Sequence, residues 1–208
     1  MIGNYTAHKL LTNFQKFDFE SRFVRRYKPK DNLYNLINDD LKKLPDGTFG
    51  KDFYRYMNYD NSSIVDLYNL YKNKKDTEKV KRYKQDWCVV HDFQHFITGY
   101  DTTLAGEGLM FTFGMRHEFR ISIIMMWIYT VINEFFKKNG LFKSKFWISL
   151  LFESYRLGKN TDWLMNIDWK SKFDKPTKEV IKEIGITDKP QLWLLSKNYI
   201  KHNYKGEM

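Results

Sequence analysis

Hydrophobic residues recur along most of this chain at spacings of three and four, which is the period of a helix with one apolar face. Strict alternation of apolar and polar residues, which is typical of a half-buried strand, is rare. We therefore predict an all-α fold. Helices are expected over residues 31–43, from about 77 to 98, over 121–136 and over roughly 145–157.

Glycine, proline and capping residues mark the predicted ends of the helices. The run from residue 44 to 50 reads as a turn that leads into a further helix. Gly99 is expected to end the helix before it in the left-handed conformation. Thr102 or Thr103 can cap the helix that follows. Other boundaries are expected at Pro29, Ser62 or Ser63, Gly114, Gly140, Gly158, Pro176, Gly185 and Pro190.

The 208 residues fit one domain, because no repeat, low-complexity linker or shift in composition divides them. We predict a single all-α domain over residues 1–208, a helical bundle large enough to fold without a disulfide. Cys88 is the only cysteine, which fits a reducing compartment. The longest apolar run, at 121–132, is shorter than the roughly 20 residues of a membrane span, and residues 1–12 lack a signal-peptide pattern.

The net charge of +10 leaves anionic membranes, nucleic acids and acidic small molecules as candidate partners. Basic residues gather at 9–30, at 72–84 and at 137–145. Solvated helix faces and helix C-termini account for many such charges. An anionic membrane surface is the next interpretation. We expect no nucleic-acid partner, because no nucleic-acid-binding motif is recognised.

Two histidines and an aspartate lie together inside the predicted helix at 77–98. His91 and His95 are four residues apart, so their side chains lie one above the other on one helix face. Asp92 can join the edge of that face. Two imidazoles at this spacing share a metal ion in the helical zinc motif of metalloproteases. The pattern therefore favours a metal site.

A further carboxylate can complete this site. Glu107 follows His95 after eleven residues, and a tight connection from Gly99 to Thr103 would return it to about the level of the histidines. We predict that one divalent metal ion is ligated by His91, Asp92, His95 and Glu107.

Each of these residues also has an ordinary explanation. A histidine in an apolar helix is usually a core residue with a satisfied hydrogen bond, and a carboxylate such as Glu107 is favoured near a helix N-terminus. A capping box does not explain Glu107, because its acidic residue would stand at Gly106, three residues after Thr103. We interpret His117 as a surface helix residue.

The pattern of His91, Asp92, His95 and then Glu107 resembles the signature of the ubiquinone biosynthesis family known as the fourth Coq protein. The residues at 98–100 and 104–107 resemble it as well, and so does the glycine turn at 44–50. Matches at 82–83, 168–169 and 183–186 extend the resemblance over roughly residues 33–186. Lys159, where the family leads us to expect arginine, and the basic segments are departures. They bear on lipid or partner preference more than on the metal.

The resemblance implies a metal site between two helices and an apolar lipid channel. It also implies removal of the C1 carboxyl group from a polyprenylated 4-hydroxybenzoate, in some accounts with hydroxylation of C1. Asp92 and Glu107 are the candidate catalytic residues, Asp92 for proton transfer. The ligand set suits zinc, and also iron or manganese. The lipid channel is expected from residues that would otherwise be ordinary core: Leu109, Met110, Phe113, Ile124, Met125 and Ile128.

Two functions from different classes stay open at this point. The first is a metal-dependent lyase acting on a membrane-embedded quinone precursor. The second is a non-catalytic prenyl-lipid-binding scaffold that organises other quinone-biosynthesis proteins around a structural metal. A phosphohydrolase would need more histidine and aspartate ligands than the sequence offers. A homodimer is a further expectation. The expected location is peripheral, on the matrix side of the mitochondrial inner membrane or on the cytoplasmic side of a bacterial inner membrane.

Overall fold

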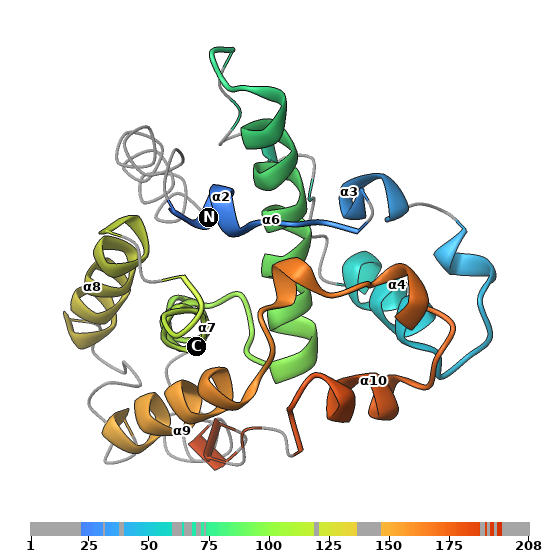
Figure 1. Ribbon diagram of the computed structural model, residues 1–208. Helices are drawn as coiled ribbons and strands as arrows, with labels where there is room; N and C mark the ends of the chain where they lie inside the picture. The colour runs from blue at the N-terminus through green and yellow to red at the C-terminus, as the bar shows by residue number, and fades with distance from the viewer. Residues whose placement is uncertain are drawn as a thin grey trace. The chain divides into compact units, whose positions relative to one another are not determined.

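The computed structural model describes residues 22–30, 32–37, 40–59, 64, 68–69, 72, 74–118, 121–136, 147–187, 190, 192–193 and 195–196 (Figure 1). Over these residues the regular structure is helical, with no strand beyond an isolated bridge between Thr48 and Pro176. The predicted all-α class is confirmed. The α-helices are α2 (Arg22–Arg26), α3 (Leu33–Leu36), α4 (Phe49–Tyr59), α6 (Glu78–Thr98), α7 (Leu104–Gly114), α8 (Ile121–Phe136), α9 (Trp147–Asn160) and α10 (Thr177–Glu183). Short 3-10 helices are η1 (Leu41–Lys43), η3 (Leu164–Asn166) and η4 (Lys170–Lys172).

Several predicted boundaries are confirmed. Helix α8 has the predicted bounds, and α6 begins one residue later than expected. Gly99 follows α6 with a φ of 74°, in the left-handed region that favours glycine. Thr103 is the residue that caps α7.

Two predicted boundaries are wrong. The helix expected over 31–43 is two short pieces, α3 and η1, because Ile37 leaves the helical region with a ψ of 89°. The asparagine and two aspartates that follow at 38–40 favour turns over helix. Gly158 does not end its helix, since α9 continues to Asn160. The predicted cap at Ser62 or Ser63 and the basic residues at 137–145 lie outside the described residues.

The chain forms two compact units, the first of residues 1–97 and 161–187 and the second of residues 98–160 and 188–208. In the first unit, aromatic side chains hold one face of α6. Phe93 is fully buried, and its ring centroid lies 4.3 Å from that of Phe53 and 4.5 Å from that of Trp169. Phe49 joins the cluster, 5.4 Å from Phe93. Tight aromatic packing of this kind fixes how α6 is turned about its own axis.

Asp86, also on α6, ties the segment at 22–37 to the helix. Its buried carboxylate accepts hydrogen bonds from the Tyr27 hydroxyl, from the Tyr34 backbone N–H at 3.0 Å and from the Arg82 guanidinium at 3.3 Å. Burial, and then Asp86 itself, raise the pKa of Tyr27, so the hydroxyl keeps the proton that it donates. A buried carboxylate with three donors is stabilised in place.

The predicted turn at 44–50 leads directly into α4. The helix begins at Phe49, inside the predicted turn, and the backbone N–H groups of Phe49 and Gly50 donate to the carbonyls of Lys175 and Phe173 at 2.8 and 2.9 Å. The turn is thereby joined to the segment that precedes α10. The same segment carries Trp169 of the aromatic cluster, so it also supports α6.

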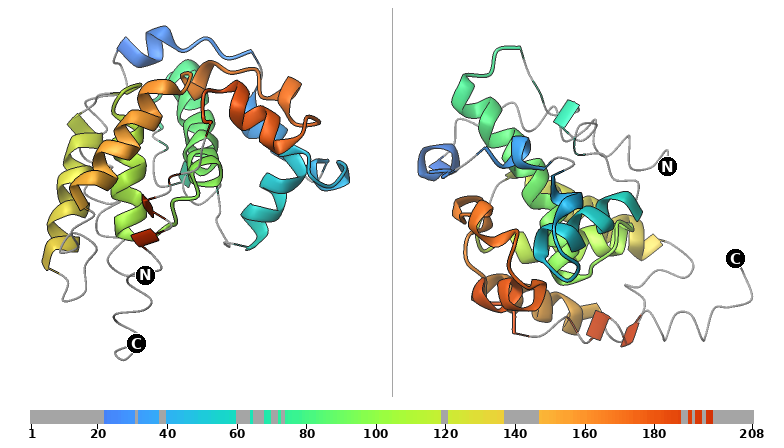
Figure 2. Two further views of the ribbon diagram at one scale, coloured as in Figure 1. Left: turned by 90° about the horizontal axis from the view of Figure 1, so that it is seen from below. Right: turned by 90° about the vertical axis from the view of Figure 1, so that its right-hand side faces the viewer.

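In the second unit, α8 and α9 both pack on α7 (Figures 1 and 2). Eight of the eleven residues of α7 are buried. The Trp127 indole N–H on α8 donates to the Thr112 hydroxyl at 2.9 Å, and the Ser154 hydroxyl on α9 donates to the Leu109 carbonyl at 2.6 Å. These two bonds fix how each outer helix faces α7. None of the described helices is both long and apolar enough to cross a membrane.

Gly158 allows α9 to approach α7 closely. A Cβ atom at this position would lie 2.0 Å from the carbonyl oxygen of Phe113, far inside van der Waals contact. The backbone there cannot yield as a flexible side chain would. Gly158 therefore allows two helices to pack closely. From the sequence alone, the same glycine was interpreted as the end of its helix.

We expect Gly158→Ala to lower the free energy of unfolding by about 1–3 kcal/mol, because α9 must move away from α7. The control is Gly114→Ala, where no atom outside its chain neighbours and the backbone of its own helix lies within 4 Å of the new Cβ. That change should be neutral or stabilising by about 0.5–1 kcal/mol. Urea unfolding followed by circular dichroism measures both. Equal midpoints for the two variants would contradict the close approach.

Candidate metal centre

Helix α6 places His91 and His95 on one face, as the spacing predicts. Both imidazoles are buried, at 8% and 1% exposure, and their ring centroids lie 4.8 Å apart. Phe93, between them in sequence, points to the aromatic cluster in a different direction around the helix. The packing that fixes α6 therefore also fixes the direction of the two histidines.

Asp92 is buried beside the first histidine. Its Oδ1 lies 2.9 Å from Nδ1 of His91. Since a carboxylate can only accept, this contact assigns the ring proton to Nδ1 and the lone pair of the neutral ring to Nε2. A carboxylate that holds a histidine in this way sets its tautomer and orientation and makes it a stronger metal ligand. The contact gives Asp92 a positioning role, while its predicted role as a direct ligand stays a prediction.

The turn after α6 determines where Glu107 begins. Asp101 Oδ1 accepts hydrogen bonds from the Thr103 backbone N–H at 3.2 Å and from its hydroxyl at 2.6 Å. The Thr103 hydroxyl oxygen in turn accepts from the Gly106 N–H at 3.2 Å and caps α7. Glu107 stands in the first turn of this capped helix and is half-buried. Its position also agrees with the ordinary preference of carboxylates for helix N-termini.

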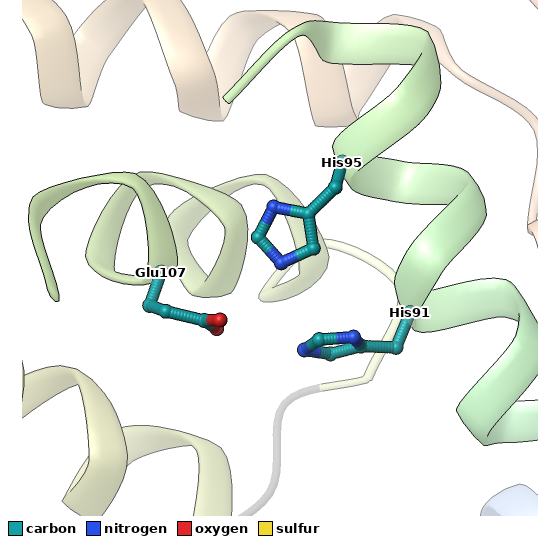
Figure 3. Close-up of side chains that lie close together, drawn as sticks. All are labelled: His91, His95 and Glu107. Atoms are coloured by element: carbon teal, nitrogen blue, oxygen red, sulfur yellow. The ribbon is translucent and has the colours of Figure 1, made fainter. Parts of the chain in front are cut away.

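The three side chains come together. His91, His95 and Glu107 each offer one ligand atom, and these atoms all lie within 4.8 Å of one another. Figure 3 shows the two rings and the carboxylate directed toward one another from α6 and α7. Ligand atoms bonded to one tetrahedral zinc ion are about 3.4 Å apart, given bond lengths of 2.0–2.1 Å. The group could therefore hold a metal ion.

The chemistry of the donors also fits. Two imidazole nitrogens and one carboxylate oxygen are a frequent set in catalytic zinc sites, and in iron sites of oxygenases. Three protein ligands leave a coordination position for water or substrate. Cys88 does not belong to the group. Burial, and then the charge of Asp92, raise the pKa of the Cys88 thiol, so it stays a protonated core residue.

One neighbour of the site was missed by sequence reasoning. The Trp87 ring lies 5.6 Å from the His91 ring, at an interplanar angle of 45°. Trp87 precedes His91 by four residues, so the spacing that pairs His91 with His95 could have identified it. The ring lies against one side of the imidazole and adds to the contacts that hold it.

The predicted lipid-channel residues divide into two sets. Leu109, Met110 and Phe113 are buried in α7, and Ile124 on α8 is half-buried. The remaining two, Met125 and Ile128, are 41% and 38% exposed. The order of apolar residues along α8 does not show which side of the helix faces α7. For this reason the exposed and the less exposed residues were predicted together as one channel. The lipid-binding role of all six stays a prediction.

His117 differs from its interpretation as a surface helix residue. It lies in the turn after α7, is half-buried, and its ring centroid is 6.2 Å from that of Phe113. The neighbouring Glu118 is buried. The helix ends at Gly114, so the chain turns inward here and does not continue along the surface.

Comparisons with known proteins place this chain in a family. The family model of the coenzyme Q (ubiquinone) biosynthesis protein Coq4 matches residues 1–190. The mitochondrial ubiquinone biosynthesis protein COQ4 of Scheffersomyces stipitis is 25% identical over 180 residues, covering 86% of this chain and 54% of the relative. That of Vanderwaltozyma polyspora is 29% identical over 178 residues, covering 84% and 50%. The chain thus spans about half the length of these two relatives.

In two further comparisons the similarity covers most of this chain and most of the other protein. The mitochondrial COQ4 homolog of Nematostella vectensis is 24% identical over 188 residues, covering 88% of this chain and 86% of the relative. A crystal structure from Nostoc punctiforme, of a protein assigned to ubiquinone biosynthesis, superposes with a TM-score of 0.58 at 22% identity. It covers 88% of this chain and 82% of that one, and supports the fold alone. By the match over residues 1–190, the chain belongs to the family of the coenzyme Q (ubiquinone) biosynthesis protein Coq4.

Proposed function

We propose that this chain acts in ubiquinone biosynthesis as a metal-dependent decarboxylase of a polyprenylated 4-hydroxybenzoate. The names of its relatives support the pathway. The observation that carries the chemical proposal is the grouping of His91, His95 and Glu107 within 4.8 Å. A site with two nitrogens, one oxygen and an open position suits a reaction at a carboxylate better than a purely structural ion.

The residues divide into those that hold an ion and those that support them. His91, His95 and Glu107 are the proposed ligands, and Asp92 orients His91 through Nδ1. When bound, a divalent ion, for which zinc is the first expectation and iron or manganese the alternatives, supplies Lewis acidity and a fixed point for the substrate carboxylate. The burial of both histidines excludes water from one side of the group and strengthens its electrostatic interactions.

The reaction exchanges a proton for carbon dioxide without change of oxidation state. A proton adds to C1 of the ring, helped by electron donation from the hydroxyl group para to it. The bond from C1 to the carboxyl carbon then breaks, its electron pair returns to the ring, and carbon dioxide leaves. We assign the proton transfer to Asp92, which for this step takes up a proton from solvent on Oδ2 and passes it to C1, while Oδ1 goes on accepting the hydrogen bond from Nδ1 of His91.

The prenyl tail requires apolar surface that begins near the reacting group. Helix α7 is the candidate, because Leu109, Met110 and Phe113 follow Glu107 along it; their side chains are buried in the core, so a tail would have to displace neighbouring side chains to reach them. Each buried methylene contributes about 0.8 kcal/mol, so a few isoprene units bind strongly. We propose that the tail contacts these residues while the ring stays beside the histidines.

The proposed location follows from the relatives and from the substrate. The relatives named above are described as mitochondrial, and a polyprenylated substrate resides in a membrane. We propose a peripheral position on the inner membrane, on its matrix side in a mitochondrion. Other quinone-biosynthesis proteins and a second copy of the chain are the proposed protein partners.

The metal proposal is tested by elemental analysis of the purified protein. Wild type should contain about one equivalent of a transition metal, and His91→Ala/His95→Ala should lose it while keeping its helical circular dichroism. Asp92→Asn should weaken metal affinity by about 10- to 100-fold, because His91 loses its orienting carboxylate. His117→Gln is the matched control and should keep a full complement. Full metal content in the double variant would refute the site.

The activity is tested by complementation in a host that makes ubiquinone and lacks its own copy of this gene. Such a strain should accumulate the prenylated precursor that still carries its C1 carboxyl group, and the wild-type chain should clear it. Glu107→Gln should reduce clearance by at least about 100-fold, on the order of 3 kcal/mol of transition-state stabilisation.

Glu179→Gln, an exposed carboxylate on α10, is the control and should behave as wild type. Mass spectrometry of lipid extracts measures the precursor and the quinone in each strain. If Glu107→Gln restores quinone synthesis as fully as wild type, the enzymatic proposal fails. The non-catalytic scaffold would then be the better account.

A further inference from the structure

The large apolar side chains that are exposed are not spread evenly. Among the described residues, every one of them belongs to the second unit, and the first unit contributes none. Eight lie on α8 and α9, and one is Leu195 near the end of the described chain. The eight are Met125, Ile128, Ile132, Phe135 and Phe136 on α8, and Ile148, Phe152 and Tyr155 on α9. Apolar residues concentrated in this way mark a contact surface.

On α8 these residues form a continuous stripe. Met125, Ile128, Ile132 and Phe135 follow at spacings of three, four and three, so they share one face of the helix. The opposite face carries buried residues such as Met126 and supports the contact with α7. The stripe is therefore directed away from α7. Phe135 and Phe136, at 57% and 78% exposure, end the helix with two open aromatic rings.

On α9 the stripe ends in a positive charge. Ile148, Phe152 and Tyr155 share one face, and Lys159 follows Tyr155 by four residues on the same face. Arg156 lies beside it, and both cations are exposed. Apolar side chains followed by a long cationic side chain are the pattern of helices that lie in a membrane interface.

No exposed residue on the described parts of α8 and α9 is acidic. The carboxylates on these helices are turned inward: Glu134 is buried, and Glu153 is half-buried and accepts a hydrogen bond from the Leu192 N–H. Apart from Ser149 and Asn160, the exposed side chains of these helices are thus apolar or cationic, on a chain of net charge +10. Its charge complements an anionic surface. A second copy docked through the same face by two-fold symmetry would bring like charges together.

We propose that the exposed faces of α8 and α9 dock onto the surface of an anionic lipid bilayer. The apolar side chains enter the boundary between headgroups and acyl chains, and Arg156 and Lys159 reach lipid phosphates. This docking surface extends the proposed function, because it brings the chain to the membrane that holds a prenylated substrate. It depends on α8 and α9 alone, so its failure and that of the metal site are separable.

The test uses the full chain and sedimentation with vesicles, either of phosphatidylcholine alone or of phosphatidylcholine with phosphatidylglycerol. Wild type should bind the anionic vesicles at low salt and weaken at high salt. Ile132→Ser/Phe152→Ser should bind about tenfold more weakly, with unchanged circular dichroism and metal content. Both positions are exposed, so the fold is not at stake.

The charged residues have a matched control. Arg156→Gln/Lys159→Gln should weaken binding by roughly 30-fold at low salt, at about 1 kcal/mol for each cation. Lys170→Gln/Lys178→Gln removes the same charge from exposed positions of the first unit and should lose much less. If both double variants lost the same amount of vesicle affinity, the attraction would depend only on the net charge of the chain. That result would overturn the docking surface.

A polarity-sensitive dye reports insertion directly. Attached at Phe152→Cys, it should shift its emission to shorter wavelength with anionic vesicles, whereas the same dye at Lys178→Cys should not. The single native cysteine, Cys88, is fully buried and does not compete for the dye. No shift at either position overturns the proposal. The proposal is also overturned if Ile132→Ser/Phe152→Ser keeps its affinity for vesicles and instead loses a dimer that wild type forms in size-exclusion chromatography. That result would assign the face to contact with a second copy of the chain.

Discussion

The packing of Phe93 is the interaction on which the candidate site depends. This ring is fully buried against Phe53 and Trp169, with centroids 4.3 and 4.5 Å away. A helix packed so closely cannot turn about its axis without opening a cavity in the core. Because His91 and His95 lie two residues to either side of Phe93, the same packing sets the direction of both imidazoles. The direction of the two candidate metal ligands is therefore set by aromatic packing on another face of α6.

The second requirement is a carboxylate delivered to these histidines by a short stretch of chain. Gly99 ends α6 in the left-handed conformation, and Asp101 holds Thr103, which caps α7. Glu107 then stands one turn into the helix, where the helix dipole also favours a negative charge. A carboxylate in the first turn is common in helices, and here Glu107 is also the third candidate ligand of the group. Asp92 adds the contact that fixes the tautomer of His91.

The elements that were predictable from sequence are those whose determinants are local. The i, i+4 spacing identified His91 and His95, and Gly99 and Thr103 act as their residue types suggest. One wrong prediction, the helix over 31–43, overlooked a local turn signal at 38–40, and the others concern tertiary context. Gly158 is small because the Phe113 carbonyl is adjacent, and His117 lies in the turn after α7 because that helix ends at Gly114. Spacing along one helix contains neither fact.

The central claim is that His91, His95 and Glu107 share one metal ion. Crystals of the metal-loaded protein, with anomalous diffraction measured at the absorption edge of the metal found in it, test this most directly. The account predicts one anomalous peak about 2.0–2.2 Å from a nitrogen of each histidine and an oxygen of Glu107, with Asp92 on Nδ1 of His91. An anomalous peak bound elsewhere, or one at the histidines with Glu107 outside coordination distance, would contradict it.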